Sequence, residues 1–100
     1  MERVTADEIR SFAKSLGGKP LHTLAQGKEF TVEVDGDYIL YTPASTGKQR
    51  RHRPAYLEAV CERFSDTNSY HSSTYRPVTL NPSYTLAVID AYLKSKGRHC

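Results

Sequence analysis

Residues 29–42 read EFTVEVDGDYILYT, from Glu29 through Asp35-Gly36-Asp37 to Thr42. Apolar and polar residues alternate before the central glycine, and a mostly apolar run follows it. A period of two is typical of a strand with one buried face, and Asp-Gly is a preferred pair for the tight turn between two strands. The stretch therefore predicts a β-hairpin.

Two turns fit this hairpin. If the loop is Asp35-Gly36, Val32 lies opposite Ile39, and if the loop is Gly36-Asp37, Val34 lies opposite Ile39. Side chains alternate between the two faces of a strand, so both registers place the same apolar residues on one face. This face, which we expect to line the core, carries Phe30, Val32, Val34, Ile39 and Tyr41.

Three helices are expected around the hairpin. The first, at about 6–16, begins with a capping box of Thr5 and Glu8 and ends before Gly17-Gly18. The second, at about 54–65, opens with Pro54 at the first helical position, which proline favours. The third, at about 82–95, is capped by Asn81 and is apolar around most of its circumference, which is typical of a central, buried helix.

Residues 70–80 alternate in a β-like but polar pattern, with Pro77 inside the run. Proline lacks the backbone N–H that a central strand needs, so the pattern favours an edge strand or an extended loop. The predicted fold is α+β: a small antiparallel sheet, built from the hairpin at about 29–42 and an edge strand at about 70–80, is packed by three helices. We assign residues 1–95 to this single domain and residues 96–100 to a short basic tail.

The composition is that of an ordinary globular domain. The chain has 100 residues, 25% of them charged, and starts with polar residues rather than the apolar region of a signal peptide. No run approaches the ~20 apolar residues that cross a bilayer, so we expect a soluble, cytoplasmic protein with no membrane partner. Cys61 and Cys100 make no disulfide framework, and we expect Cys61 to be a small buried apolar residue.

Residues 42–54, which we call the basic segment, read TPASTGKQRRHRP and contain four cations and no acid. The chain has 14 Lys and Arg against 11 Asp and Glu, and without these four the balance becomes 10 against 11. One segment thus supplies the whole positive excess, which favours anion binding, above all to nucleic acid. The expected contacts are Lys48, Arg50, Arg51, His52, Arg53 and the Thr46 hydroxyl, which Arg76, Lys96 and Arg98 would extend if the fold brings them near.

Aromatic residues near the basic segment are candidates for stacking on bases. They are Tyr41, His52 and Tyr56, and Tyr70 and Tyr75 deserve the same consideration because their neighbours are small and polar. The alternative interpretation of the segment is a solvated connection between a strand and a helix, whose cations serve solubility alone.

The sequence contains no complete motif for a nucleotide-binding or metal-binding site. Thr46-Gly47-Lys48 lacks the earlier glycine and the following Ser or Thr of a phosphate-binding P-loop, because Thr42 and Gln49 stand there. The histidines and cysteines have no metal-ligand spacing. We therefore expect no metal and no cofactor.

Two other functions remain open. A metal-independent RNase would use His71 or His52 as the base and Arg76 or Arg51 to stabilise the transition state. A protein-interaction module, such as an inhibitor or accessory subunit, would dock its basic segment on an acidic partner and contribute apolar contacts from Tyr38, Leu40, Tyr70 and Tyr75. A homodimer formed by strand pairing is expected if an edge of the hairpin is uncovered.

Two motifs add a resemblance. They are Tyr41-Thr42-Pro43-x-Ser45-Thr46-Gly47-Lys48-x-Arg50 and Tyr75-x-x-Val78-Thr79-x-Asn81-x-Ser83-Tyr84-x-Leu86-Ala87. The region 27–93 resembles small α+β proteins carried on mobile elements, including integron gene cassettes, and modules that accompany restriction systems. The resemblance implies a bacterial accessory protein that engages DNA; it supplies no catalytic residue and does not account for Arg51-His52-Arg53.

The leading hypothesis is a non-enzymatic nucleic-acid-binding protein, with DNA as the expected ligand, that contacts phosphates through the basic segment. Phosphate contacts position a protein but carry little sequence information.

Overall fold

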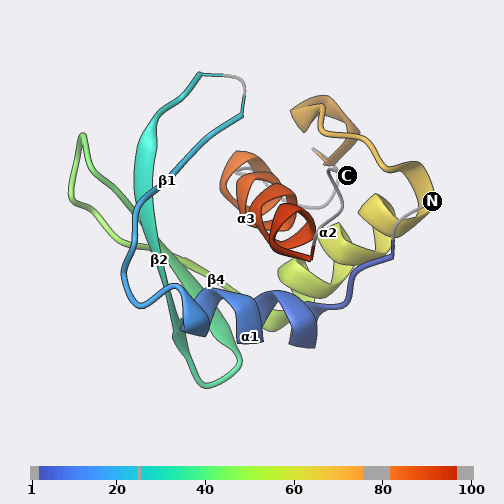
Figure 1. Ribbon diagram of the computed structural model, residues 1–100, viewed down its shortest axis with the longest axis horizontal. Coiled ribbons are helices and arrows are strands. Elements are labelled where there is room, and N and C mark those ends of the chain that lie inside the picture. The colour runs from blue at the N-terminus through green and yellow to red at the C-terminus, as the bar shows by residue number, and fades with distance from the viewer. Residues whose placement is uncertain (1–2, 25, 76–81, 97–100) are drawn as a thin grey trace.

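In the residues that the structure describes, 3–24, 26–75 and 82–96, three α-helices cover one face of a four-stranded antiparallel sheet (Figure 1). This computed structural model contains, in chain order, α1 (Ala6–Ser15), β1 (Leu21–His22), β2 (Glu29–Asp35), β3 (Tyr38–Pro43), β4 (Arg50–His52), α2 (Pro54–Thr67), the 3₁₀ helix η1 (Ser72–Tyr75) and α3 (Pro82–Ser95). The strands lie in the order β1-β2-β3-β4. The predicted α+β fold, with its antiparallel sheet and three helices, is confirmed.

The hairpin of β2 and β3 closes on the loop Gly36-Asp37. Val34 pairs with Ile39 and Val32 pairs with Tyr41, which is the second of the two predicted registers. Gly36 has a φ of 62°, in the left-handed region that a tight hairpin turn needs at its first loop position. The expected core face is confirmed, because four of its residues are buried and the fifth packs against them: Phe30, Val32, Ile39 and Tyr41, with Val34 partly buried.

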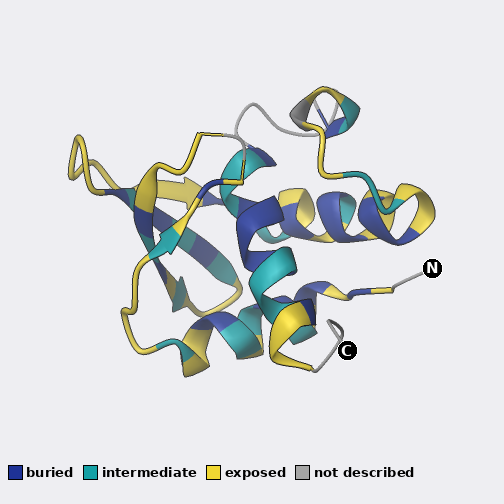
Figure 2. Cartoon of the chain, turned by 45° about the horizontal axis from the view of Figure 1, so that its top comes forward, coloured by how far each residue is buried: buried dark blue, intermediate teal, exposed yellow. Residues whose placement is uncertain are grey.

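Tyr41 lies at the centre of the core. Its ring stacks on Tyr84 of α3 with the ring centroids 5.4 Å apart, and it meets the Phe30 ring of β2 at 5.9 Å. Its hydroxyl lies 2.6 Å from the Thr85 hydroxyl, so the buried phenol has a hydrogen-bond partner inside the protein. Helix α3 is buried around much of its surface and contacts α1, α2 and β1, as expected of a central helix (Figure 2).

Glu8 joins the start of α1 to the end of α3. One carboxylate oxygen accepts hydrogen bonds from the Thr5 backbone and hydroxyl, and the Glu8 backbone N–H donates to that hydroxyl, which confirms the capping box. The other oxygen accepts a hydrogen bond from the Tyr92 hydroxyl and lies 3.9 Å from the Lys96 ammonium. The hydrogen bond from Tyr92 is the main cause that lowers the pKa of the Glu8 carboxyl, and the same bond raises the pKa of Tyr92.

Helix α2 starts at Pro54, as predicted, and continues two residues past the expected end. It stops at Asn68, whose φ of 52° lies in the left-handed region that commonly ends helices. Cys61 is buried on the inner side of this helix, as expected, and burial raises its pKa to about 12. Among the helices of the described chain, none combines the length and the apolar character that a membrane crossing requires.

The expected edge strand at 70–80 is wrong for its first half. Residues 72–75 form the 3₁₀ helix η1, and Tyr75 is fully buried rather than exposed. The hydroxyls of Ser69 and Thr74 lie 2.9 Å apart, and the Tyr75 hydroxyl donates to the Ser69 carbonyl at 2.6 Å. Such short-range hydrogen bonds from hydroxyl side chains compete with strand pairing. Residues 76–81, which include Pro77 and the cap predicted at Asn81, lie outside the described residues.

Two short strands that the sequence analysis did not predict complete the sheet. β1 pairs with β2 through Leu21 and Phe30, and β4 pairs with β3 through His52 and Ile39. Each edge of the hairpin is therefore paired over part of its length, at Glu29 and Phe30 on one side and at residues 39–41 on the other. The strand-paired homodimer stays a prediction. β4 occupies residues that were expected to belong to a loop. Its pairing with β3 determines the face of the sheet on which each of its arginines lies.

Replacing Glu8 by alanine removes the capping box and the link to Tyr92 together. The Thr5 cap itself remains, because its hydroxyl accepts from the backbone N–H of residue 8. Loss of the hydrogen bonds to the Glu8 carboxylate lowers the free energy of unfolding by about 1 kcal/mol, which for a chain of this size lowers the melting temperature by roughly 4–8 °C. The matched control is Glu62→Ala, an exposed acid on α2. Thermal melts of equal midpoint for the two variants would contradict the role assigned to Glu8.

Candidate anion-binding segment

The basic segment spans four structural parts: the end of β3, the loop 44–49, β4 and the start of α2. The loop projects from the side of the sheet, away from the helices (Figure 1), and its residues are exposed (Figure 2). Lys48, Arg50, Arg51 and Arg53 are all exposed. The structure thus places the predicted cations along one exposed stretch, with Lys48 in the projecting loop, Arg50 and Arg51 on β4 and Arg53 at the start of α2.

Backbone hydrogen bonds fix the base of this loop. The Ala44 N–H donates to the Glu29 carbonyl at 3.0 Å, and the Gly47 N–H donates to the Pro43 carbonyl at 2.8 Å. Gly47 has a φ of 66°, which favours glycine at this position. The Thr46 hydroxyl accepts a hydrogen bond from the Lys48 N–H at 3.2 Å, so its oxygen is engaged within the loop while its O–H remains a donor.

Strand alternation divides the arginines of β4 between its two sides. Arg50 pairs with Tyr41 and His52 pairs with Ile39, so both lie on the face of the sheet that the helices cover. Arg51 pairs with Leu40 on the opposite face, where its guanidinium carbon lies 4.0 Å from the centre of the Tyr38 ring. The cations therefore point to both sides of a narrow ribbon rather than to one surface.

His52 is a core residue. It is 6% exposed, and its ring meets the Tyr41 ring edge-on with the centroids 4.9 Å apart. Burial lowers the pKa of the His52 imidazole, and the positive charge of Arg50 lowers it further. His52 was expected to contact a ligand, and the structure shows its side chain buried against Tyr41, where it anchors β4 on the core while Arg51 and Arg53 stay in solvent.

The positive charge of the segment is not neutralised within the described protein. Neither Lys48 nor any of the three arginines forms an ion pair with a described residue, although ion pairs occur elsewhere on the surface, as between Lys94 and Asp90 at 3.0 Å. Four neighbouring cations that repel one another in water are stabilised by a polyanion. This local excess is what distinguishes the segment from the rest of the surface.

Most of the aromatic residues proposed for stacking are enclosed by protein. Tyr41 and Tyr75 are fully buried, so the expectation that they stack on bases is wrong. Tyr70 is 39% exposed but packs on Phe64, with the ring centroids 5.2 Å apart, near the far end of α2. Tyr56, 42% exposed in the first turn of α2, remains beside the basic segment.

Of the residues expected to extend the patch, the structure describes Lys96, which lies elsewhere. Lys96 lies by Glu8 and Tyr92 at the end of α3 and thus belongs to the link between α1 and α3. Arg76 and Arg98 lie outside the described residues.

An RNase site that uses His52 as the base and Arg51 to stabilise the transition state does not fit the structure. The two side chains lie on opposite faces of the sheet, and the imidazole is buried.

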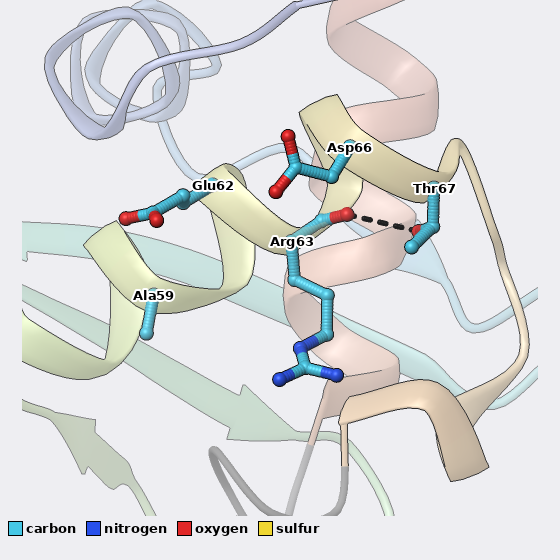
Figure 3. Close-up of a pocket in the computed structure, with 5 residues that line it drawn as sticks. All are labelled: Ala59, Glu62, Arg63, Asp66 and Thr67. Carbon is cyan, nitrogen blue, oxygen red and sulfur yellow. Dashed lines mark hydrogen bonds between the residues drawn. The ribbon is translucent and has the colours of Figure 1, made fainter.

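A hollow on α2 is the other surface feature of interest (Figure 3). It is lined by Ala59, Glu62, Arg63, Asp66 and Thr67. The carboxylates of Glu62 and Asp66 lie on one side, while the guanidinium of Arg63 points away from them. Two carboxylates beside one cation disfavour phosphate binding, so the basic segment remains the better candidate.

Acidification is expected to destabilise the protein through His52. Because its pKa is lowered in the folded state, the unfolded chain takes up the proton first, and the free energy of unfolding falls as the pH drops below about 6.5. The slope attributable to one such group is at most about 1.4 kcal/mol per pH unit. His52→Phe keeps a ring against Tyr41 and should flatten this dependence.

Urea unfolding at about pH 7.5, 6.5 and 5.5 measures the effect, in a range above the titration of most carboxylates. The control is His71→Ala, which removes an exposed imidazole and should leave the slope as it is. An unchanged slope in His52→Phe would show that the buried imidazole does not control this pH dependence.

Comparison with known proteins places this chain in no family. No protein-family model, curated protein or solved structure matches it significantly. A function for the basic segment therefore has to be argued from its charge, exposure and geometry.

Proposed function

We propose that this protein is a non-enzymatic nucleic-acid-binding protein that contacts the phosphate backbone through Lys48, Arg50, Arg51 and Arg53. The observation that carries the proposal is the run of four exposed cations, from the projecting loop through β4 to the start of α2, that has no acidic partner among the described residues. Each cation that neutralises a phosphate releases counterions into solution, and this release drives binding.

The start of α2 supports the same ligand. Arg53 is its N-cap and Pro54 its first residue, and no side chain caps the helix there. The positive end of the helix dipole thus lies beside the arginines, where it adds to the attraction for an anion. A cap of Asp or Glu, which many helices use, would oppose phosphate binding at this place.

DNA is the nucleic acid that we propose, in an accessory protein of a bacterial mobile element. The support for this setting is the resemblance of the motifs around Tyr41–Arg50 and Tyr75–Ala87 to small proteins of integron cassettes and restriction-associated modules. Binding to bacterial DNA implies a cytoplasmic protein.

A protein-interaction module is the second candidate. One observation favours it: Tyr38 and Leu40 are only partly buried, on the face of the sheet that no described helix covers. Arg51 lies on this face as well, so an acidic partner protein would meet both apolar and basic groups. Tyr75, which is buried, takes no part in such a contact. Failure to bind free nucleic acid would favour this candidate.

The binding proposal predicts a salt dependence. In fluorescence anisotropy with labelled duplex DNA, the logarithm of the binding constant should fall with the logarithm of salt concentration with a slope of about −3.6, as expected for four phosphate contacts. The variant with Lys48, Arg50, Arg51 and Arg53 all changed to Ala should lose this slope and most of its affinity.

Loss of net charge alone must be separated from loss of the site. A control variant with Lys14, Lys19, Lys28 and Arg63 changed to Ala removes four exposed cations elsewhere. Both variants have the same formal charge, and the control should keep most of the slope. Equal losses in both variants would contradict a site at the basic segment, and absence of binding at ~50 mM salt would reject nucleic-acid binding altogether.

An RNase would reveal itself in the same samples. Cleavage of RNA in EDTA that disappears in His71→Ala would replace the non-enzymatic proposal with a metal-independent nuclease. We expect intact RNA after prolonged incubation with the natural protein, measured by denaturing gel electrophoresis.

A further inference from the structure

The shape and charge of the hairpin indicate which nucleic acid it fits. We infer that the ligand is B-form duplex DNA and that the loop 44–49, which projects from the sheet between β3 and β4, enters the major groove while the arginines of β4 lie at the base of the loop. This inference rests on the proposed function and specifies the ligand and the mode of binding.

The hairpin of β3 and β4 has the dimensions of a groove-binding element. The six-residue loop 44–49, which joins β3 to β4 and carries Lys48, projects beyond the sheet (Figure 1), whereas β3 itself pairs with β2 as far as Pro43. Paired strands lie ~4.8 Å apart, and the major groove of B-form DNA, about 12 Å wide, admits a two-stranded ribbon. The tip begins with small residues, Ala44, Ser45, Thr46 and Gly47, so its leading part is narrow.

The distribution of cations matches a ligand that flanks the hairpin on both sides. Arg50 lies on one side of β4, and Arg51 lies on the other. A groove has a phosphate backbone along each wall, so cations on both sides of an inserted ribbon can each meet a phosphate. A single strand that lies on a surface would leave one of these two arginines without a phosphate.

The scarcity of free aromatic faces argues against a single strand. Proteins that bind single strands stack successive bases on exposed rings. Beside the basic segment Tyr41 and His52 are buried, and the Tyr38 ring is occupied by the Arg51 guanidinium. Of the described rings next to the segment, this leaves Tyr56 as an exposed stacking partner, which is too few for a strand of several bases.

The same geometry argues against duplex RNA. A-form RNA has a deep, narrow major groove that protein side chains do not enter, and its wide minor groove is shallow. A projecting loop with cations on both sides can therefore enter the major groove of B-form DNA and contact the phosphate backbones that flank it. It cannot enter the narrow major groove of A-form RNA in this way.

The anchoring of β4 makes insertion possible without remodelling the fold. His52 holds one end of the strand against Tyr41, and hydrogen bonds to Glu29 and Pro43 hold the base of the loop. The hairpin is thus presented as a pre-ordered element, which lowers the entropic cost of binding.

Three labelled probes of one sequence test the inference: a duplex DNA of about 20 base pairs, its single strand and the corresponding duplex RNA. The natural protein should bind the duplex DNA at least about tenfold more tightly than either of the others, at salt where non-specific binding is measurable. Distamycin, which occupies the minor groove, should not displace it.

A second variant tests the hairpin separately from its charge. Deletion of Ser45 and Thr46 shortens the tip but keeps all four cations, and the remaining four-residue loop is a length common in hairpins. We expect weaker binding to duplex DNA, unchanged weak binding to the single strand, and a melting temperature close to that of the natural protein.

The outcomes separate the two levels of the proposal. Equal or tighter binding of the single strand or the duplex RNA, displacement by distamycin, or full affinity of the shortened hairpin would each overturn groove insertion. If the four-alanine variant still loses the salt dependence of binding in those cases, the proposed function, nucleic-acid binding through the basic segment, stands. No binding of any probe would overturn both.

Discussion

The burial of Tyr41 is the constraint on which the rest of this structure depends. The ring contacts β2 through Phe30, α3 through Tyr84 and β4 through His52, and the hydroxyl contacts Thr85. A phenol that is fully removed from water must have a hydrogen-bond partner, and burial raises its pKa, so it stays neutral. One side chain thus fixes the position of α3 over the sheet and the register of the strand that carries the arginines.

Local patterns predicted the elements whose signals lie within a few residues. The alternation around Gly36 gave the hairpin, Thr5 and Glu8 gave the start of α1, and Pro54 gave the start of α2. β1 and β4 were missed because two or three residues are too few to show a period. Residues 72–75 were misread because Ser and Thr alternate as in a strand but bond to their own turn.

The sequence predicted that the cations of the candidate site are clustered, but it did not predict which of the neighbouring aromatic residues are buried. Charge clustering is visible in sequence, and the exposure of Lys48 and the arginines follows from the cost of burying charge. The burial of Tyr41 follows from the alternation of the hairpin 29–42, whereas that of His52 depends on the pairing of β4 with β3, which is a tertiary contact. Strand alternation then decides that Arg51 and His52, although adjacent in sequence, lie on opposite faces of the sheet.

The edges of the sheet have a consequence for the behaviour of the chain at high concentration. A long, flat edge strand recruits further strands from other molecules and leads to aggregation. Here β1 has two residues and β4 has three, two of them arginines, while the long apolar strands β2 and β3 lie between them. The arginines of β4 therefore act as gatekeepers: they repel a second copy of the same edge and help to keep the folded protein dispersed when it is abundant.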